Sequence, residues 1–175
     1  FRDRGFAITN VAVKSNGLVI EKLPANIRAA AYVSPSNHAF TGSVMPVGRR
    51  YELLAWAEEN NSYIIEDDYD SEFRFDAHPM PAIQALDAEG RVIYMNTFSK
   101  SLAPSIRISY MVLPDQLMAR FRQQLGFYSC TVPSFEQYTL ARFIRGGYFE
   151  KHINRMRKFY KTSRNRLVER LKNWE

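Results

Sequence analysis

Lys100 and the polar residues near it are the part of this sequence best suited to chemistry. The lysine follows the apolar run Val92–Met95. A lysine amine acts as a covalent catalyst when it condenses with a carbonyl, and burial favours the neutral amine that this reaction needs. Thr97, Ser99 and Arg107 add two hydroxyls and a planar guanidinium. These groups are suited to binding a phosphate.

An acidic segment that contains Asp67 and Tyr69 follows a second apolar run, Tyr63–Ile65. A carboxylate keeps a pyridine nitrogen protonated, and the protonated ring stabilises a carbanion by withdrawing electrons. Together with the lysine segment, these groups suit a pyridine aldehyde that bears a phosphate. Two alternatives remain open from the residues alone. The alternative for Lys100 is that it is an ordinary solvated lysine on a surface loop. The alternative for the acidic segment is that it binds a divalent cation through Glu66, Asp67, Asp68 and Asp70.

The composition is that of an ordinary globular protein. The 175 residues are 46% hydrophobic and carry a formal net charge of +6. Because no apolar stretch reaches the ~20 residues that span a bilayer, we expect no membrane partner. A single cysteine, Cys130, excludes an internal disulfide and fits a reducing cytoplasm. Much of the positive charge lies beyond residue 150, on what we predict to be a solvated helix face, since no base-reading motif accompanies it.

The alternation of predicted strands and helices indicates an α/β fold with a helix-flanked sheet. In such sheets, ligands bind beyond the carboxyl ends of the strands, where Asp67 and Lys100 are expected. The expected elements are β-prone sequence at 6–13, a turn at 15–17, a short helical connection at 18–28, strands at 29–33, 63–66, 91–96 and 106–113, and helices at 46–60, 82–86, 115–126, 133–145 and 148–174.

Three motifs, in this order and spacing, carry a family resemblance. They are Pro35-Ser36…Thr41-Gly42, the segment Ile65–Phe73 (Ile-Glu-Asp-Asp-Tyr-Asp-Ser-Glu-Phe), and Thr97-Phe-Ser-Lys100…Arg107. The chain resembles, over nearly its whole length, the pyridoxal-phosphate fold of class I aminotransferases. This resemblance implies an α/β large domain in three layers, with a mixed, mostly parallel sheet flanked by helices. More narrowly, it is similar to the aminotransferase-like domain of MocR/GabR-type bacterial transcription regulators, which belong to the GntR family.

The resemblance implies a role for each motif residue. Lys100 would form the aldimine with pyridoxal 5'-phosphate, Asp67 would pair with the pyridine nitrogen, and Tyr69 would hydrogen-bond the phenolic oxygen. Ordinary aminotransferases of this type usually place the tyrosine three residues after the aspartate, where this chain has Asp70. The position of Tyr69 therefore favours the regulators. The phosphate would be held by Thr97, Ser99 and Arg107.

One departure from the enzymes concerns the loop Ala39–Gly42, which reads Ala-Phe-Thr-Gly. Many aminotransferases carry Asn-Pro-Thr-Gly there, and the asparagine assists the phenolic oxygen. That hydrogen bond must be missing here or supplied by Asn37 or His38. This departure argues against efficient transamination.

The resemblance also implies an organisation. Residues 1–147 would belong to the cofactor-binding large domain, and residues 148–175 would form a long helix leading toward a C-terminal small domain. The domain would sense an amino compound or pyridoxal phosphate through aldimine formation. DNA would be bound only by an N-terminal domain outside this chain, and a cytoplasmic homodimer is expected. The alternatives are an active class I aminotransferase of the 2-aminoadipate type, acting on 2-oxo acids, and a degenerate fold without cofactor.

Overall fold

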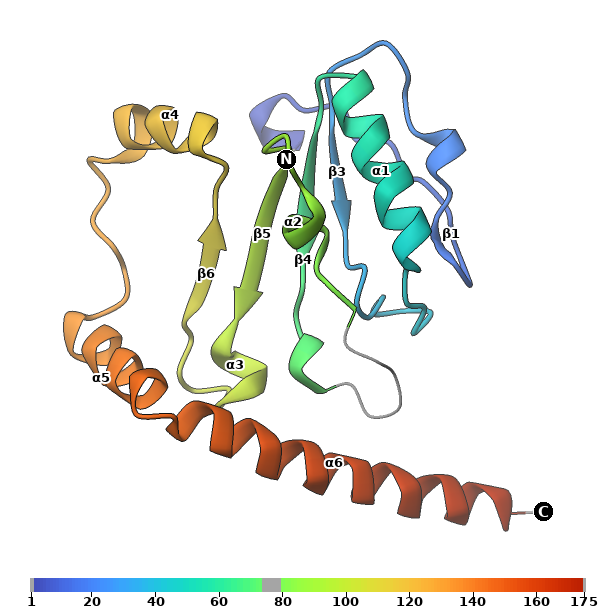
Figure 1. Ribbon diagram of the computed structural model, residues 1–175, viewed down its shortest axis with the longest axis vertical. Helices are drawn as coiled ribbons and strands as arrows, with labels where there is room; N and C mark the ends of the chain where they lie inside the picture. Colours follow the sequence, from blue (N-terminus) through green and yellow to red (C-terminus); the bar gives the residue numbers. More distant parts are fainter. Residues whose placement is uncertain (1, 74–79, 175) are drawn as a thin grey trace. The chain divides into compact units, whose positions relative to one another are not determined.

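The computed structural model describes residues 2–73 and 80–174 (Figure 1). The ends of the two predicted segments, Phe1 and Glu175, lie outside the described residues. The described part of the chain divides into two compact units. Residues 2–68, 80–95 and 111–115 form the first unit, and residues 69–73, 96–110 and 116–174 form the second. The division does not follow the predicted boundary after residue 147, which stays a prediction.

The first unit contains the strands that lead to the acidic segment. A four-stranded sheet has the order β3-β4-β5-β6, and a two-stranded ribbon pairs β1 with β2. The elements of this part of the chain, of which β5 and β6 also extend into the second unit, are η1 (Arg2–Arg4), β1 (Val13–Lys14), β2 (Gly17–Leu18), η2 (Ile20–Lys22), β3 (Ala30–Val33), α1 (Val47–Glu59), β4 (Tyr63–Asp67), α2 (Ile83–Leu86), β5 (Val92–Thr97) and β6 (Ser109–Val112).

Strand β4 pairs in parallel with both of its neighbours. Tyr32 of β3 is in register with Ile65, and Tyr94 of β5 is in register with Glu66. Parallel neighbours need a crossover connection, and α1 supplies the one between β3 and β4. The sequence therefore correctly predicted the parallel, helix-connected character of this sheet.

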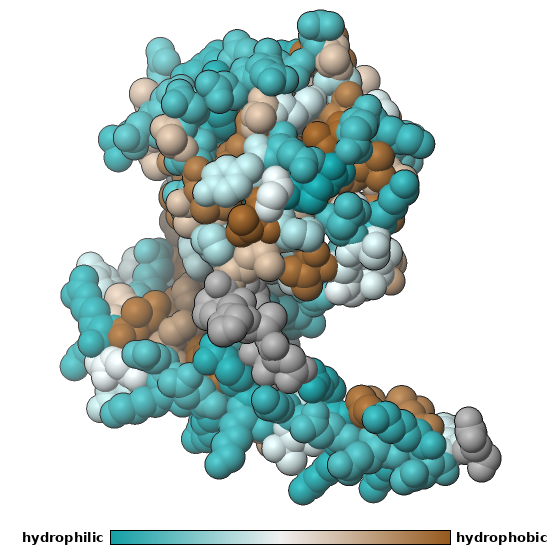
Figure 2. Space-filling model, turned by 45° about the vertical axis from the view of Figure 1, so that its right-hand side comes forward, coloured by the Kyte–Doolittle hydropathy of each residue, from teal (hydrophilic) through white to brown (hydrophobic). Residues whose placement is uncertain are grey.

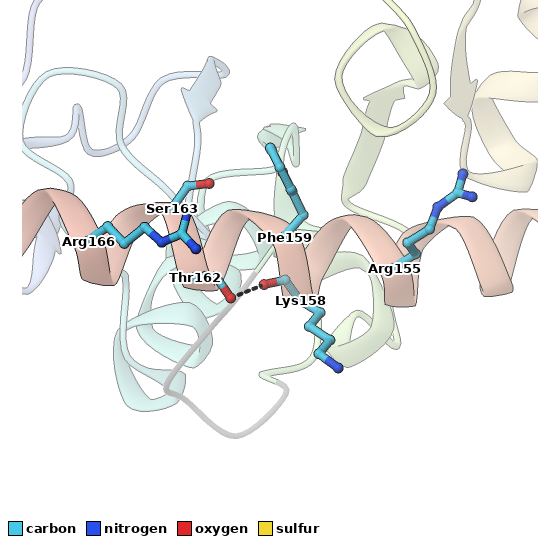
Figure 3. A pocket seen from close by; sticks show the side chains of 6 residues that line it. All are labelled: Arg155, Lys158, Phe159, Thr162, Ser163 and Arg166. Carbon is cyan, nitrogen blue, oxygen red and sulfur yellow. Dashed lines mark hydrogen bonds between the residues drawn. The ribbon is translucent and has the colours of Figure 1, made fainter.

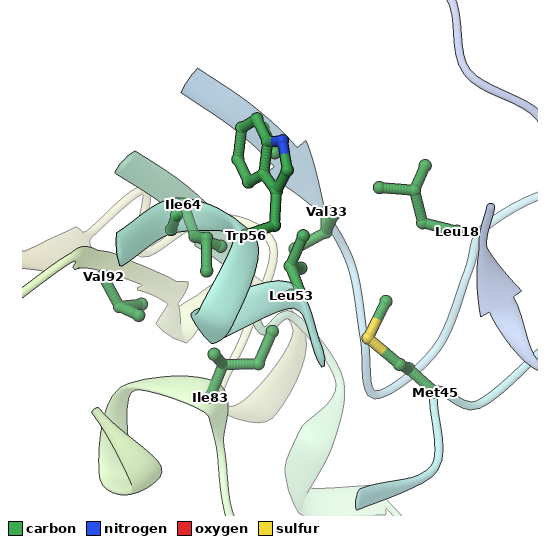
Figure 4. Packing of buried hydrophobic residues seen from close by; sticks show 10 residues of the cluster. Leu18, Val33, Met45, Leu53, Trp56, Ile64, Ile83 and Val92 are labelled. Atoms are coloured by element: carbon green, nitrogen blue, oxygen red, sulfur yellow. The ribbon is translucent and has the colours of Figure 1, made fainter. Parts of the chain in front are cut away.

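The core of the first unit lies between α1 and one face of the sheet (Figure 4). Leu53, Ala57 and Ile64 are completely buried in it. The indole Nε1–H of Trp56 donates to the carbonyl of Pro24 at 2.9 Å, so the largest core side chain keeps its polar atom satisfied. Alternate residues of β4 point into this core because successive side chains of a strand face opposite sides of the sheet.

The second unit is organised by the long helix α6 (Tyr148–Lys172). Its other elements are η3 (Ser71–Phe73), α3 (Phe98–Ser101), most of α4 (Asp115–Leu125) and α5 (Ser134–Arg145). Figure 2 shows that the surface of α6 is mostly hydrophilic, with hydrophobic residues near its C-terminal end. This matches the solvated basic face predicted from the sequence.

Several expected boundaries differ from those observed. The β-prone stretch at 6–13 yields only the two-residue strand β1, and the helical connection at 18–28 is reduced to η2. Lys100 lies on the short helix α3 rather than on a loop, because Thr97 caps that helix with its side-chain oxygen. Within the described residues, no helix combines the length and the hydropathy of a membrane-spanning segment.

Candidate functional site

The acidic segment places three successive carboxylates on β4 and just beyond it. Glu66 is fully buried and accepts hydrogen bonds from the backbone N–H groups of Ile83 and Gln84, at 2.8 and 2.9 Å. Burial raises the pKa of Glu66 above its usual value, although these two hydrogen bonds oppose the shift. Glu66 is thus a structural residue that joins β4 to α2.

Asp68 is also buried, and both of its carboxylate oxygens are occupied. Ser36 donates its hydroxyl to Oδ1, and Tyr94 donates its phenol to Oδ2 at 2.9 Å. The bond from Ser36 connects the loop after β3 to the end of β4. Asp68 therefore has a structural role like that of Glu66.

Asp67 differs from its two neighbours because the alternation of the strand turns its side chain to the opposite face. It is partly exposed, and its Oδ2 accepts a hydrogen bond from the phenol of Tyr32 on β3. Its Oδ1 accepts no hydrogen bond from any other described residue. Among the three acids, Asp67 alone keeps an oxygen for a ligand, as the sequence prediction requires.

The geometry argues against the cation site that the acidic segment left open. Three of the four acids alternate between two faces of the sheet and cannot converge on one ion. Across residues 2–73 and 80–174, the side chains of His, Cys, Asp and Glu form no group of three or more that could hold a metal.

Lys100 lies in the second unit, on α3. Its ammonium is 3.6 Å from Oδ2 of Asp70, and the two side chains are 63% and 22% exposed. Asp70 adopts a positive φ of 62°, a conformation that aspartate tolerates better than most residues. The exposed amine can reach a ligand, and Asp70 is its ion-pair partner in this state.

Two hydroxyls that we predicted to bind phosphate lie together next to Lys100. The Thr97 hydroxyl lies 3.2 Å from Oγ of Ser99 and 3.2 Å from the carbonyl oxygen of Ile108. The single hydrogen of the Thr97 hydroxyl is within reach of both acceptors, and the Thr97 oxygen itself accepts from the backbone N–H of Ser99 at 3.2 Å.

Arg107 directly precedes Ile108, whose carbonyl also accepts from the backbone N–H of Phe98 at 2.9 Å. These bonds bring the backbone at Arg107 close to the start of α3. Arg107 is exposed and adopts a positive φ of 46°, which is uncommon for a residue with a side chain. Its guanidinium makes no hydrogen bond or ion pair with the other described residues, so its predicted role in holding phosphate stays a prediction.

Helix α6 fixes both segments of the second unit that carry candidate residues. The ring of Phe149 contacts that of Phe98 on α3, with centroids 5.7 Å apart, and Nε2 of His152 lies 3.1 Å from the carbonyl oxygen of Ser101. Further along, Arg157 donates to the carbonyl of Glu72 at 2.9 Å. The helix that was predicted only as a connection therefore braces the segments around Lys100 and Asp70.

The remaining predicted residues lie in loops. Tyr69 is partly buried in the turn after β4. Nδ1 of His38 lies 2.9 Å from Oγ1 of Thr41, and the carbonyl of His38 accepts from the backbone N–H of Gly42 at 2.8 Å. These contacts close the loop on itself, so His38 serves the local structure here.

A hollow of about 350 Å³ lies elsewhere, along α6 (Figure 3). Thr162 donates its hydroxyl to the carbonyl of Lys158 within it, at 3.0 Å. All the residues that line it come from this one helix, so it is a groove between side chains of successive turns and includes none of the predicted site residues. They are Arg155, Lys158, Phe159, Thr162, Ser163 and Arg166.

Each unit by itself offers groups that suit part of pyridoxal phosphate. In the second unit, Lys100 offers an exposed amine and Ser99 a hydroxyl, and in the first unit Asp67 keeps Oδ1 for a ring nitrogen. Sequence reasoning missed two contacts of these residues, Tyr32 with Asp67 and Asp70 with Lys100. A signal for Tyr32 existed: it is the one polar-tipped side chain in the apolar strand next to the acidic one.

Comparisons with known proteins agree with this fit. The model of the family described as aminotransferase class I and II matches residues 1–175. The chain is 48% identical over 162 residues to the HTH-type transcriptional regulator YdeL of Bacillus subtilis. This match covers 93% of this chain and 35% of the relative. It is 39% identical over 156 residues to the probable rhizopine catabolism regulatory protein MocR of Rhizobium meliloti, covering 89% and 32%.

Among solved structures, the kynurenine aminotransferase of Pyrococcus horikoshii, in complex with PMP, is 35% identical with a TM-score of 0.78. The match covers 93% of this chain and 42% of that one. The chain thus spans about a third of the length of the curated relatives named above. The resemblance predicted from the three motifs is confirmed, and the chain belongs to the class I and II aminotransferase family.

Proposed function

We propose that this chain is the pyridoxal-phosphate-binding, aminotransferase-like effector domain of a bacterial transcription regulator of the GntR/MocR type. The observation that carries the cofactor assignment is the environment of Asp67. It stands between two buried, fully hydrogen-bonded acids, yet it faces the other side of the sheet and keeps one oxygen for a ligand. The similarity to HTH-type regulators supports the regulatory part of the proposal.

Each candidate residue has a separate task in this proposal. When bound, pyridoxal phosphate supplies an aldehyde and a protonated ring that withdraws electrons. Lys100 would hold the cofactor through its amine, Asp67 would accept a hydrogen bond from the protonated ring nitrogen, and Tyr69 would donate to the phenolic oxygen. The phosphate is bound by Thr97, Ser99 and Arg107.

Lys100 must release a proton before its nitrogen can attack a carbonyl. Asp70 lies 3.6 Å from the ammonium, so a ligand that approaches the lysine must first displace this ion pair. The weak coupling expected for an exposed pair, about 0–1 kcal/mol, makes this displacement easy.

We further propose that an amine or amino acid is the effector. Its amino group would replace that of Lys100 on the cofactor, and the freed lysine side chain would change the packing of α3 against α6. Such a change would alter DNA binding by a separate domain of a cytoplasmic homodimer.

An active aminotransferase is the second candidate. The likeness to the kynurenine aminotransferase, at 35% identity and a TM-score of 0.78, favours it. In that case Lys100 would serve as the group that accepts and returns the proton of the substrate carbon. Net transfer of an amino group from an amino acid to a 2-oxo acid distinguishes the enzyme from the regulator.

The proposal is tested with the intact polypeptide that carries this chain. Titration with pyridoxal phosphate is expected to produce a visible absorption band that Lys100→Ala abolishes, while Lys172→Ala, which removes an exposed lysine at the end of α6, leaves it unchanged. Gel-shift assays with DNA from upstream of the protein's own gene then measure whether amino compounds change DNA binding. A band that persists in Lys100→Ala contradicts the cofactor assignment.

A further inference from the structure

We infer that Tyr32 is a positioning residue for Asp67. Its phenol holds one carboxylate oxygen and leaves the other directed to the ring nitrogen of the cofactor. The inference rests on the proposed function and adds to it a residue that lies outside all three sequence motifs.

The register of the sheet brings the two side chains together. Tyr32 on β3 is paired with Ile65 on β4, and Asp67 is two residues further along the same strand. Residues two apart in a strand share a face, so Tyr32 and Asp67 lie on the same side of the sheet. The phenol leans along the strand and donates its hydrogen to Oδ2 of Asp67.

The same geometry recurs on the opposite face, with a different outcome. Tyr94 on β5 is paired with Glu66 and donates to Oδ2 of Asp68, again two residues beyond its register partner. Asp68 is buried, however, and its Oδ1 is occupied by Ser36. Both oxygens of Asp68 are used within the fold, whereas Asp67 has one left over.

The bond to Tyr32 has a physical consequence for ligand binding. A carboxylate held at one oxygen cannot rotate freely, so its second oxygen keeps a fixed direction before the ligand arrives. Hydrogen bonds to ionised groups are stronger than neutral ones, and a binding group fixed in advance loses less entropy on association. Because Tyr32 is 55% exposed, we expect a moderate effect.

The inference is tested with Tyr32→Phe in the intact protein, which removes only the hydroxyl. The dissociation constant is measured for pyridoxal phosphate and for its 1-deaza analogue, in which C–H replaces the ring nitrogen. We expect Tyr32→Phe to weaken binding of pyridoxal phosphate about 3- to 10-fold and to change binding of the analogue less than about 2-fold. With ¹⁵N-labelled cofactor, the ring-nitrogen signal should shift toward that of neutral pyridine.

Tyr94→Phe is the matched control, since it removes the same hydroxyl from the neighbouring carboxylate. It should change the affinities for the two ligands by the same factor, or not at all. A double-mutant cycle gives a second test: in the Asp67→Asn background, Tyr32→Phe should have no further effect on the ratio of the two affinities.

The outcomes separate this inference from the proposed function. If Tyr32→Phe changes both affinities equally, or neither, then Tyr32 does not act through Asp67 and the inference is wrong, while the proposed function stands. If the wild-type protein binds neither ligand, both are overturned. An unchanged ring-nitrogen signal combined with an unchanged affinity ratio would also contradict the inference.

Discussion

Glu66 accepts a hydrogen bond from the backbone N–H of Ile83 at 2.8 Å, so a fully buried carboxyl group joins β4 to α2. Burial raises its pKa above 4.5, which means that the folded protein binds the proton more tightly than the unfolded chain does. The free energy of unfolding therefore falls as the pH rises from 4.5 through the raised pKa. Glu66→Gln should give a shallower pH dependence, measured by urea denaturation between pH 4.5 and neutrality.

The glutamine also places an amide N–H opposite a backbone N–H, which costs about 1–3 kcal/mol at every pH. This loss is constant, so it does not alter the slope. Glu58→Gln, at an exposed position of α1, should keep the wild-type slope. Equal slopes for wild type and Glu66→Gln would show that burial does not perturb this group.

Leu53 lies at the centre of the core, with no exposed surface. Leu53→Ala should lower the free energy of unfolding by about 2–5 kcal/mol, because it removes apolar contacts with Trp56 and Ile64 and leaves a cavity. Leu171→Ala, on the exposed part of α6, should change it by less than about 0.5 kcal/mol. Similar losses in the two variants, measured by chemical denaturation, would contradict the assigned core.

Arg49 on α1 forms an ion pair with Glu21 of η2, with 2.8 Å between Nη1 and Oε1. The hydrogen bond from Arg49 lowers the pKa of Glu21 to about 2. The stability that this pair contributes is therefore present above pH 4.5 and is lost as the pH falls toward 2. Acid titration of Glu21→Gln should show a difference from wild type that disappears across this range, whereas a constant difference would refute the assignment.

Asp70 lies beside the ammonium of Lys100. Asp70→Asn removes the ion-pair partner that the amine must leave before it reacts, so the lysine should react with pyridoxal phosphate about 2- to 5-fold faster. The rate is followed by borohydride trapping and peptide mass measurement. Trapping at an exposed lysine such as Lys172 serves as the internal control. An unchanged rate at Lys100 would show that the ion pair does not restrain the amine.

The sequence predicted best those features that depend on residues close together in the chain. The apolar periodicity of α6 and the spacing of the three motifs depend on neighbouring residues, and both predictions agree with the structure. The helix α3 was missed because four residues are too few to show a helical period. Its beginning depends on the capping oxygen of Thr97, which was interpreted as a phosphate ligand.

The contact between Tyr32 and Asp67 could not be predicted in the same way. The two residues are 35 positions apart, and their meeting depends on the register of β3 and β4. No short segment encodes that register, because it relates two strands that are far apart in the sequence. On this strand Tyr32 is exposed, whereas its neighbours Ala31 and Val33 are buried.

Successive side chains of β4 point to opposite faces of the sheet, so the face that Asp67 occupies depends on the number of residues that precede it in the strand. Inserting or deleting one residue before Asp67 would exchange the sides of the sheet that its acids face. A structural carboxyl group would then lie on the face of the sheet that Asp67 now occupies, and Asp67 would be driven into the apolar interior. Length changes in this strand are therefore tolerable only in steps of two.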